Sequence, residues 1–193
     1  MNDILTPQQI ETEAKSFYQE GDYLKAAKSF EAALQGYQLA NKDIMAAVMA
    51  NNCSVSYLMA DEKESALQAL EGAESVFIQA GDQKHQAMTL GNQAAALDAL
   101  GRLDDAEQKY WQAAEILKEL GEIELRLPIM QSISSLQLRT GRHLQAVASM
   151  YAGVEKIKNP TLKQRFLKHL LGIPIQLLNN QSKVLPDGSD NNS

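Results

Sequence analysis

The stretch GRLDDAEQKYWQAAEIL, residues 101–117, sets a glycine before a segment in which small and large apolar residues recur at helical spacing. Ala106, Tyr110 and Ala113 follow the glycine by five, nine and twelve residues. In an α-helix these positions lie on one face. The stretch therefore predicts a helix that packs closely through its alanines, with Gly101 as the turn before it.

The same pattern recurs at a period of 40 residues, counted from Gly21, Asp61, Gly101 and Gly141. Small residues stand five and twelve positions after the turn and seven before it, and large residues stand nine after it. The columns are Ala26, Ala66, Ala106 and Ala146; Ala33, Ala73, Ala113 and Gly153; Ala14, Ser54, Ala94 and Ser134; and Phe30, Leu70, Tyr110 and Met150. Small residues let two helix axes approach, and the large ones fill the remaining space.

A second set of breaks, at Ala40-Asn41, Ala80-Gly81, Leu120-Gly121 and Asn159-Pro160, shares the period. Each repeat therefore contains two helices, and the fold class is all-α. The predicted helices cover about 7–20, 22–40, 43–60, 62–80, 83–100, 102–120, 123–140 and 142–158. Gln137 interrupts an otherwise apolar column four residues before the turn, formed by Phe17, Tyr57 and Leu97.

The predicted domain organisation is one repeat domain over residues 1–179, with repeats at about 3–40, 43–80, 83–120 and 123–159. Pro128 removes a backbone donor, so its helix is either kinked there or begins near Leu127. Thr161 opens a ninth helix, TLKQRFLKHLL, which we expect to cap the last pair within about 161–179. Residues 180–193 are polar and turn-rich, which predicts a disordered tail.

GDYLKAAKSFEAAL (21–34) and residues 101–117 resemble the second helices of tetratricopeptide repeats, and the resemblance covers about residues 7–158. The usual repeat has about 34 residues, so these units are long. The resemblance implies a right-handed α-solenoid of four antiparallel helix pairs whose first helices line a concave groove. It also implies a protein-protein interaction module, a scaffold or adaptor, that binds a peptide or helix of an unknown partner protein in that groove.

Groove candidates are the first-helix positions that face away from the small-residue seam. The surface they form is mostly neutral. Its amides can form hydrogen bonds with any peptide backbone, and its apolar side chains can adapt to irregular surfaces. The predicted set is Glu11, Lys15, Tyr18, Val48, Asn51, Asn52, Val55, Met59, Met88, Asn92, Gln131 and Ser135. An alternative stays open for the apolar members, because apolar stripes at helical spacing also pack between helices.

Some family members grip a peptide's C-terminal carboxylate with basic residues and asparagines on these positions. Here Glu11 stands where a lysine is expected, Lys15 where an asparagine is, and Met88 and Asn92 replace two basic residues. Only Asn52 matches. Without the cations, little remains to hold a carboxylate, which disfavours that subtype.

Other functional classes lack residues to support them. The net charge of -6 argues against nucleic-acid binding, and nucleotide-binding, hydrolase-elbow and dithiol motifs do not occur. We predict no enzyme activity, no cofactor and no metal site. Cys53, the single cysteine, is expected to be a half-buried structural thiol in a cytoplasmic protein.

Two further functional hypotheses remain. The array could sense a short peptide or help to oligomerise a regulatory assembly. Alternatively, the basic, amphipathic residues 161–171 could lie on an anionic membrane, although packing as a cap is the favoured interpretation. No stretch is apolar enough to span a membrane, and the sequence does not define the oligomeric state.

Overall fold

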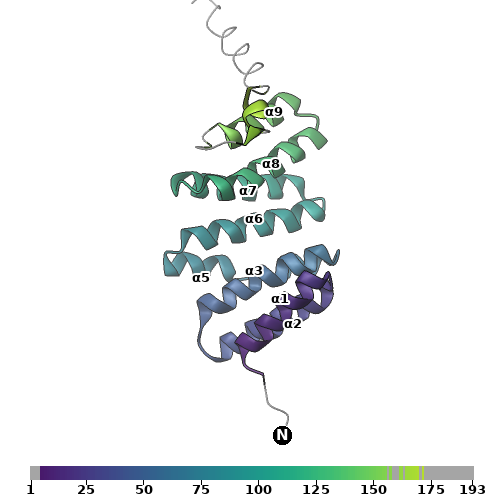
Figure 1. Cartoon of the computed structure of the whole chain (residues 1–193), viewed down its shortest axis with the longest axis vertical. Coiled ribbons are helices and arrows are strands. Elements are labelled where there is room, and N and C mark those ends of the chain that lie inside the picture. The colour runs from purple at the N-terminus through teal and green to yellow at the C-terminus, as the bar shows by residue number, and fades with distance from the viewer. Residues whose placement is uncertain (1–4, 156, 158–160, 163, 170, 172–193) are drawn as a thin grey trace, which may run out of the picture. The chain divides into compact units, whose positions relative to one another are not determined.

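The structure is a computed structural model that describes residues 5–155, 157, 161–162, 164–169 and 171, and this part of the chain is helical with short turns (Figure 1). The all-α prediction is confirmed. The helices are α1 (Pro7–Glu20), α2 (Tyr23–Leu39), α3 (Asp43–Met59), α4 (Lys63–Gln68), α5 (Ala73–Ala80), α6 (Gln83–Ala99), α7 (Leu103–Glu119), α8 (Ile123–Arg139) and α9 (His143–Val154).

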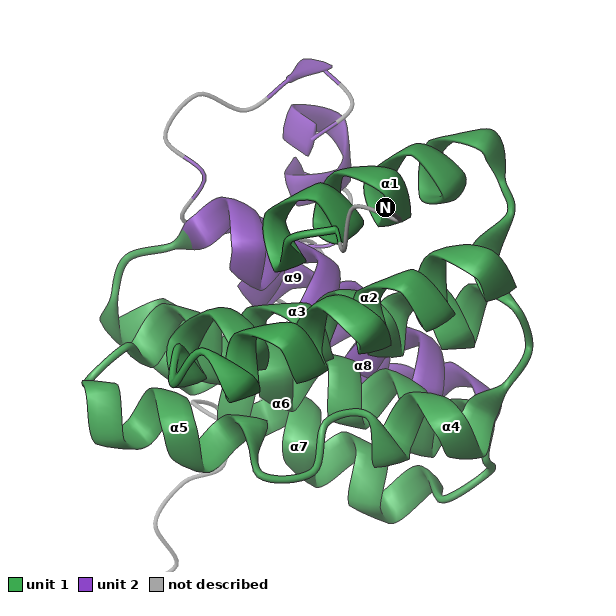
Figure 2. Ribbon diagram, turned by 90° about the horizontal axis from the view of Figure 1, so that it is seen from below, with its two compact units in different colours: residues 1–122 green, residues 123–193 purple. Residues whose placement is uncertain are grey.

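The chain divides into two compact units, residues 1–122 with α1–α7 and residues 123–193 with α8 and α9 (Figure 2). In the first unit α2 packs on both α1 and α3, the segments α4 and α5 pack on α3 and α6, and α7 packs on α6. In the second unit α8 packs on α9. The helices thus pack in neighbouring pairs, while the solenoid and the single domain over 1–179 stay predictions.

The alanine columns form the core. The alanines five residues after each turn are between 0% and 1% exposed, and Ala14, Ala94 and Ala113 are fully buried. Gln137, which interrupts its apolar column, is also buried, and its Oε1 accepts a hydrogen bond from Ser149 Oγ at 2.8 Å. The buried side chain of Gln137 thus receives a hydrogen bond from the neighbouring helix α9, as buried polar groups require.

Seven helix ends follow a period of 20 residues, while α4 and α9 end off it, at Gln68 and Val154, the latter short of the predicted end at 158. Gly21, Asn41, Asp61, Gly81, Gly101, Gly121 and Gly141 all have left-handed backbone. At each of them the next residue's N–H donates to the carbonyl five residues before it, at 2.8–2.9 Å, as Asp22 does to Phe17. These Schellman-type bonds satisfy carbonyls that a helix end leaves unpaired.

The left-handed turns predict opposite effects of two substitutions. Gly101→Ala should lower the free energy of unfolding by about 1 kcal/mol, because a Cβ strains this backbone; no atom lies within 4 Å of such a Cβ, so the cost is conformational. Asp61→Gly should raise it by roughly 0.5 kcal/mol, since Asp61 bears that strain at a φ of 64°. Urea denaturation of both variants checks this, and equal effects would contradict it.

The predicted fourth helix, 62–80, is wrong in one respect: it is broken into α4 and α5. Gly72 has a φ of 77°, which a right-handed helix cannot continue through. The equivalent positions in the other repeats are Ala32, Gln112 and Ala152, which are compatible with a helix. Gly72 was therefore the available signal for the break.

Helix α8 begins at Ile123 and contains Pro128, so a start near Leu127 is wrong. Arg126 Nη1 donates to the Ala152 carbonyl at 2.8 Å and holds the first turns of α8 against α9. Beyond α9, residues 162, 164–169 and 171 are helical, in agreement with a helix that opens at Thr161. The rest of the predicted capping helix and the predicted tail lie outside the described residues.

Candidate functional site

A hollow of about 330 Å³ lies between α1 and α3. We call it the α1–α3 hollow. It contains four of the predicted groove residues, Lys15, Tyr18, Asn52 and Val55, and it is completed by Gln19 and by Phe30 of α2. Residues 15, 18 and 19 share one face of α1 because they are three and four positions apart. The hollow thus combines a cation, a phenol and two amides with an apolar base.

Glu11, another predicted groove residue, supports the packing of α1 on α2. Its two carboxylate oxygens accept from Lys15 Nζ and from the hydroxyl of buried Tyr37, each at 2.7 Å. Burial alone would raise the pKa of Glu11, but the hydrogen bonds from Lys15 and Tyr37 outweigh it and lower that pKa. Because both oxygens are engaged, Glu11 is occupied within the fold, and Lys15 is partly neutralised.

Asn51 and Asn92 were predicted to face a partner, and the structure contradicts this for Asn51. Asn51 is only 5% exposed. Its Nδ2 donates to Thr89 Oγ1 at 3.0 Å, its Oδ1 accepts from Asn92 Nδ2 at 3.1 Å, and Thr89 Oγ1 donates to the His85 carbonyl at 2.9 Å. The two asparagines therefore join α3 to α6, since buried amides must find partners.

The remaining predicted residues differ in exposure. Val48 is half-buried and packs against the core, so the packing alternative holds for it. Met59 and Met88 are 51% and 39% exposed, which leaves both accessible to a partner. Gln131 and Ser135 are exposed on α8 and belong to the second unit.

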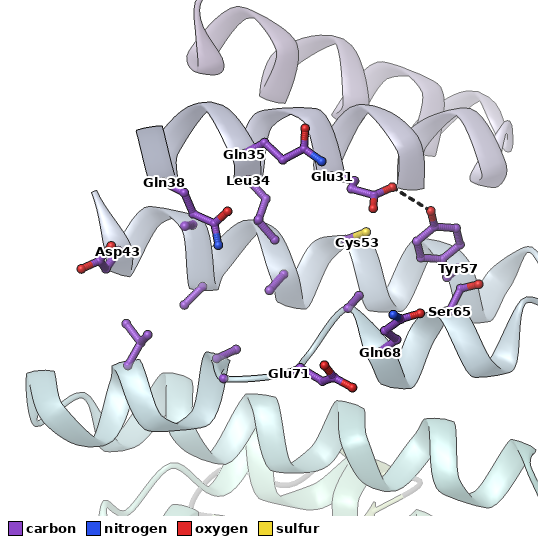
Figure 3. Close-up of a pocket in the computed structure, with 17 residues that line it drawn as sticks. Glu31, Leu34, Gln35, Gln38, Asp43, Cys53, Tyr57, Ser65, Gln68 and Glu71 are labelled. Atoms are coloured by element: carbon purple, nitrogen blue, oxygen red, sulfur yellow. Dashed lines mark hydrogen bonds between the residues drawn. The ribbon is translucent and has the colours of Figure 1, made fainter. Parts of the chain in front are cut away.

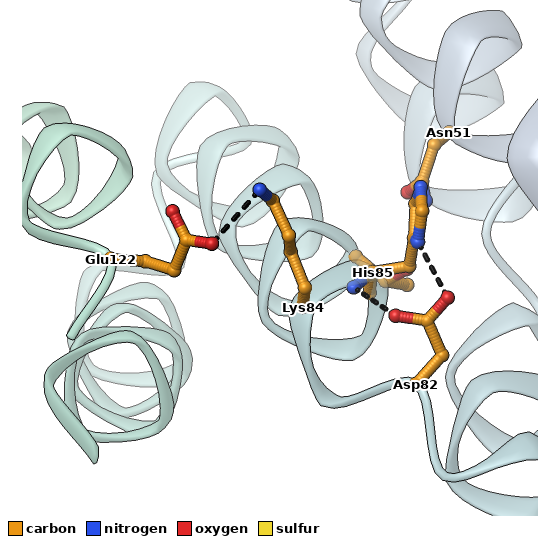
Figure 4. Close-up of polar contacts among 6 residues, drawn as sticks. Asn51, Asp82, Lys84, His85 and Glu122 are labelled. Atoms are coloured by element: carbon orange, nitrogen blue, oxygen red, sulfur yellow. Dashed lines mark hydrogen bonds and ion pairs between the residues drawn. The ribbon is translucent and has the colours of Figure 1, made fainter. Parts of the chain in front are cut away.

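The start of α6 carries a polar cluster that the sequence did not predict (Figure 4). Asp82 caps the helix by accepting from the His85 backbone at 3.1 Å, and its second oxygen lies 2.7 Å from His85 Nδ1. Burial would raise the pKa of Asp82, but these hydrogen bonds lower it. The His85 ring stacks on buried Phe77 of α5, and Lys84 pairs with Glu122 at 3.0 Å. The cluster fixes the junction between α5 and α6.

A second hollow, of about 490 Å³, lies between α2, α3 and the broken α4–α5 segment (Figure 3). We call it the second-helix groove. Sequence reasoning missed it, because it depends on the break at Gly72. Ala46, Ala50 and Cys53 of α3 lie on its floor. At about 3.6 residues per turn, this stripe and the pair Asn52 and Val55 point to roughly opposite sides of α3. Helix α3 therefore borders both hollows.

The Cys53 thiol is 1% exposed, more deeply buried than predicted, and its Sγ donates to the Ala27 carbonyl at 3.4 Å. Burial, with the Glu31 carboxylate nearby, raises the pKa of Cys53 from 9.0 to about 12. A protonated, buried thiol is a poor nucleophile. Cys53 is thus a structural residue.

Two tyrosines predict a loss of stability in alkali. Burial and hydrogen bonds to Glu11 and Glu31 raise the pKa values of Tyr37 and Tyr57 from 10.0 to about 12. Between these values the unfolded chain gives up phenolic protons that the folded chain keeps, so the free energy of unfolding should fall as the pH rises. Urea midpoints at about pH 9 and about pH 11 measure this decline. The double variant Tyr37→Phe, Tyr57→Phe should decline less; an equal decline would contradict the assignment.

Among the described residues, no group of three or more His, Cys, Asp or Glu side chains could hold a metal ion. Within the same ranges, no helix combines the length and the apolar character that crossing a membrane requires.

Comparison with known proteins supports the fold only. No protein-family model matches the chain, and no curated protein matches it. The crystal structure of BtubC (BKLC) from P. vanneervenii is similar, with a TM-score of 0.65 and 14% sequence identity over 96% of this chain and 84% of that chain. At this identity the similarity extends to the all-helical, repeat-like fold and not to the activity.

Proposed function

We propose that this chain is a non-enzymatic interaction module of the tetratricopeptide type, which binds a segment of a partner protein in the α1–α3 hollow. The supporting observation is that Lys15, Tyr18, Asn52 and Val55, all predicted from the repeat spacing, line one hollow with Phe30 at its base. The right-handed solenoid and a cytoplasmic setting belong to the same proposal.

The chemistry of the hollow favours a largely uncharged segment. Lys15 is already paired with Glu11 at 2.7 Å, so the hollow offers little net positive charge to a carboxylate. Asn52 and Gln19 can each donate to and accept from a peptide backbone. Phe30 and Val55 provide apolar surface for one anchoring side chain, as in other grooves that bind peptides.

Affinity capture with the full chain as bait, followed by mass spectrometry, tests the proposal. A partner captured by the wild type should be lost with the double variant Gln19→Ala, Asn52→Ala, which removes both amides from the hollow. Asn92 is left intact because it donates to Asn51 and supports the fold.

The matched control is Gln112→Ala, an exposed amide on α7. It should retain the partner, and all three proteins should show the same helicity and melting temperature. Equal capture by the wild type and the double variant would place the binding surface elsewhere.

A further inference from the structure

The second-helix groove lies at a junction between successive repeats, beside the break at Gly72. Leu34 of α2 and Ala69 line the groove, and the residues 40 positions later are Glu74 and Lys109. At that next junction, Lys109 Nζ pairs with Glu74 at 3.2 Å and joins α7 to α5. Leu34 and Ala69 cannot form such a bridge. The first junction therefore lacks the ion pair that joins the walls of the second one, and its hollow is lined there by Leu34 and Ala69.

The groove has an apolar floor and an acidic rim. Ala46, Ala47 and Ala50 leave room above α3 for larger side chains, and Leu34 and Val76 face the space from its two walls. Of the described residues that line it, three are carboxylates, Glu31, Asp43 and Glu71, and none is Lys, Arg or His. None of the three carboxylates forms an ion pair with a described cation, although Glu31 accepts from Tyr57 at 3.0 Å (Figure 3).

The same chain carries a segment with the complementary surface. Leu162 and Phe166, four residues apart on one helical face, are 82% and 69% exposed. Arg165 stands beside them, exposed and without an ion pair to any described carboxylate. Lys168 donates to the Glu155 carbonyl, which ties the segment to the end of α9. The segment thus presents two large apolar side chains and a cation to its surroundings.

We propose that the second-helix groove of one molecule binds the described residues 161–162 and 164–169 of a second copy. Leu162 and Phe166 would fill the space above the alanines, and Arg165 would meet the carboxylates of the rim. This is the helix-in-groove mode of recognition, in which apolar anchors spaced along one helix face enter a groove. The two surfaces differ, so the contact either propagates head-to-tail into chains of molecules or closes when two copies exchange segments. The proposal does not depend on binding at the α1–α3 hollow.

Sedimentation of the full-length chain over a range of concentrations at low salt tests this. The wild type should increase in mass with concentration. Phe166→Asp, which removes an anchor, and Glu71→Arg, which reverses the rim charge, should each stay at the mass of one chain. An equimolar mixture of the two variants should form a dimer and nothing larger. Phe166→Asp retains an intact groove, and Glu71→Arg retains an intact segment.

Leu39→Asp and Glu119→Arg serve as controls. They make the same kinds of change, apolar to acidic and acidic to basic, at exposed positions outside both surfaces, and they should associate like the wild type. A wild type that stays at the mass of one chain overturns the proposal, as does association that neither variant changes. Binding to vesicles of anionic lipid that Phe166→Asp abolishes, with no self-association, would instead assign the segment to a membrane surface.

Discussion

Ala33→Leu should lower the free energy of unfolding by about 3 kcal/mol, which is at the upper end of what overpacking a core costs. Ala33 is fully buried in the cluster where α2 meets α1 and α3. A leucine adds three carbons where the axes approach closely, so the helices must separate or the side chain must leave its preferred rotamer. Urea denaturation followed by circular dichroism measures the change.

Ala32→Leu is the matched control, because Ala32 precedes Ala33 on the same helix and is exposed. Leucine and alanine have similar helix propensities, so this variant should stay within about 0.5 kcal/mol of the wild type. If the two variants were equally stable, the alanine column would not be the close-packed seam of the repeat.

Most of the fold could be predicted from the repeat columns, because close packing between helices requires small residues at the same position of every repeat. The alanines five residues after each turn are buried in all four repeats, and the seven predicted turn residues from Gly21 to Gly141 are left-handed. The predicted break at Asn159-Pro160 lies outside the described residues. Local propensity and packing pattern agree at these positions, and such agreement makes a structure predictable from sequence.

The departures have local causes. The break between α4 and α5 ends at Gly72, which is left-handed, in a column whose other members permit a helix. Asn51 is polar and lies away from the seam, which predicts a binding residue. In the structure it is buried, because the amide of Asn92 on α6 donates a hydrogen bond to it. Period and polarity identify the face of a helix, but they do not reveal whether a neighbouring repeat covers it.

Asn51→Ala and Asn52→Ala should therefore give opposite results, although the residues are adjacent. Removing the Asn51 amide leaves Thr89 Oγ1 and Asn92 Nδ2 without their partner at the α3–α6 contact. A buried polar group deprived of its hydrogen bond costs about 1–3 kcal/mol. Thr89 Oγ1 keeps its bond to the His85 carbonyl and Asn92 is half-buried, so we expect a loss of about 2 kcal/mol. Chemical denaturation measures this loss.

Asn52 lines the α1–α3 hollow and is half-buried, and its side chain does not take part in the contact between Asn51, Thr89 and Asn92. Asn52→Ala should change the free energy of unfolding by about 0.5 kcal/mol or less, while it weakens capture of a partner. The conservative variant Thr89→Ser keeps the hydroxyl that Asn51 needs and should be much closer to the wild type than Asn51→Ala. If Asn51→Ala were as stable as Asn52→Ala, the hydrogen bonds between α3 and α6 would not stabilise the fold, and Asn51 would return to the candidates for the binding surface.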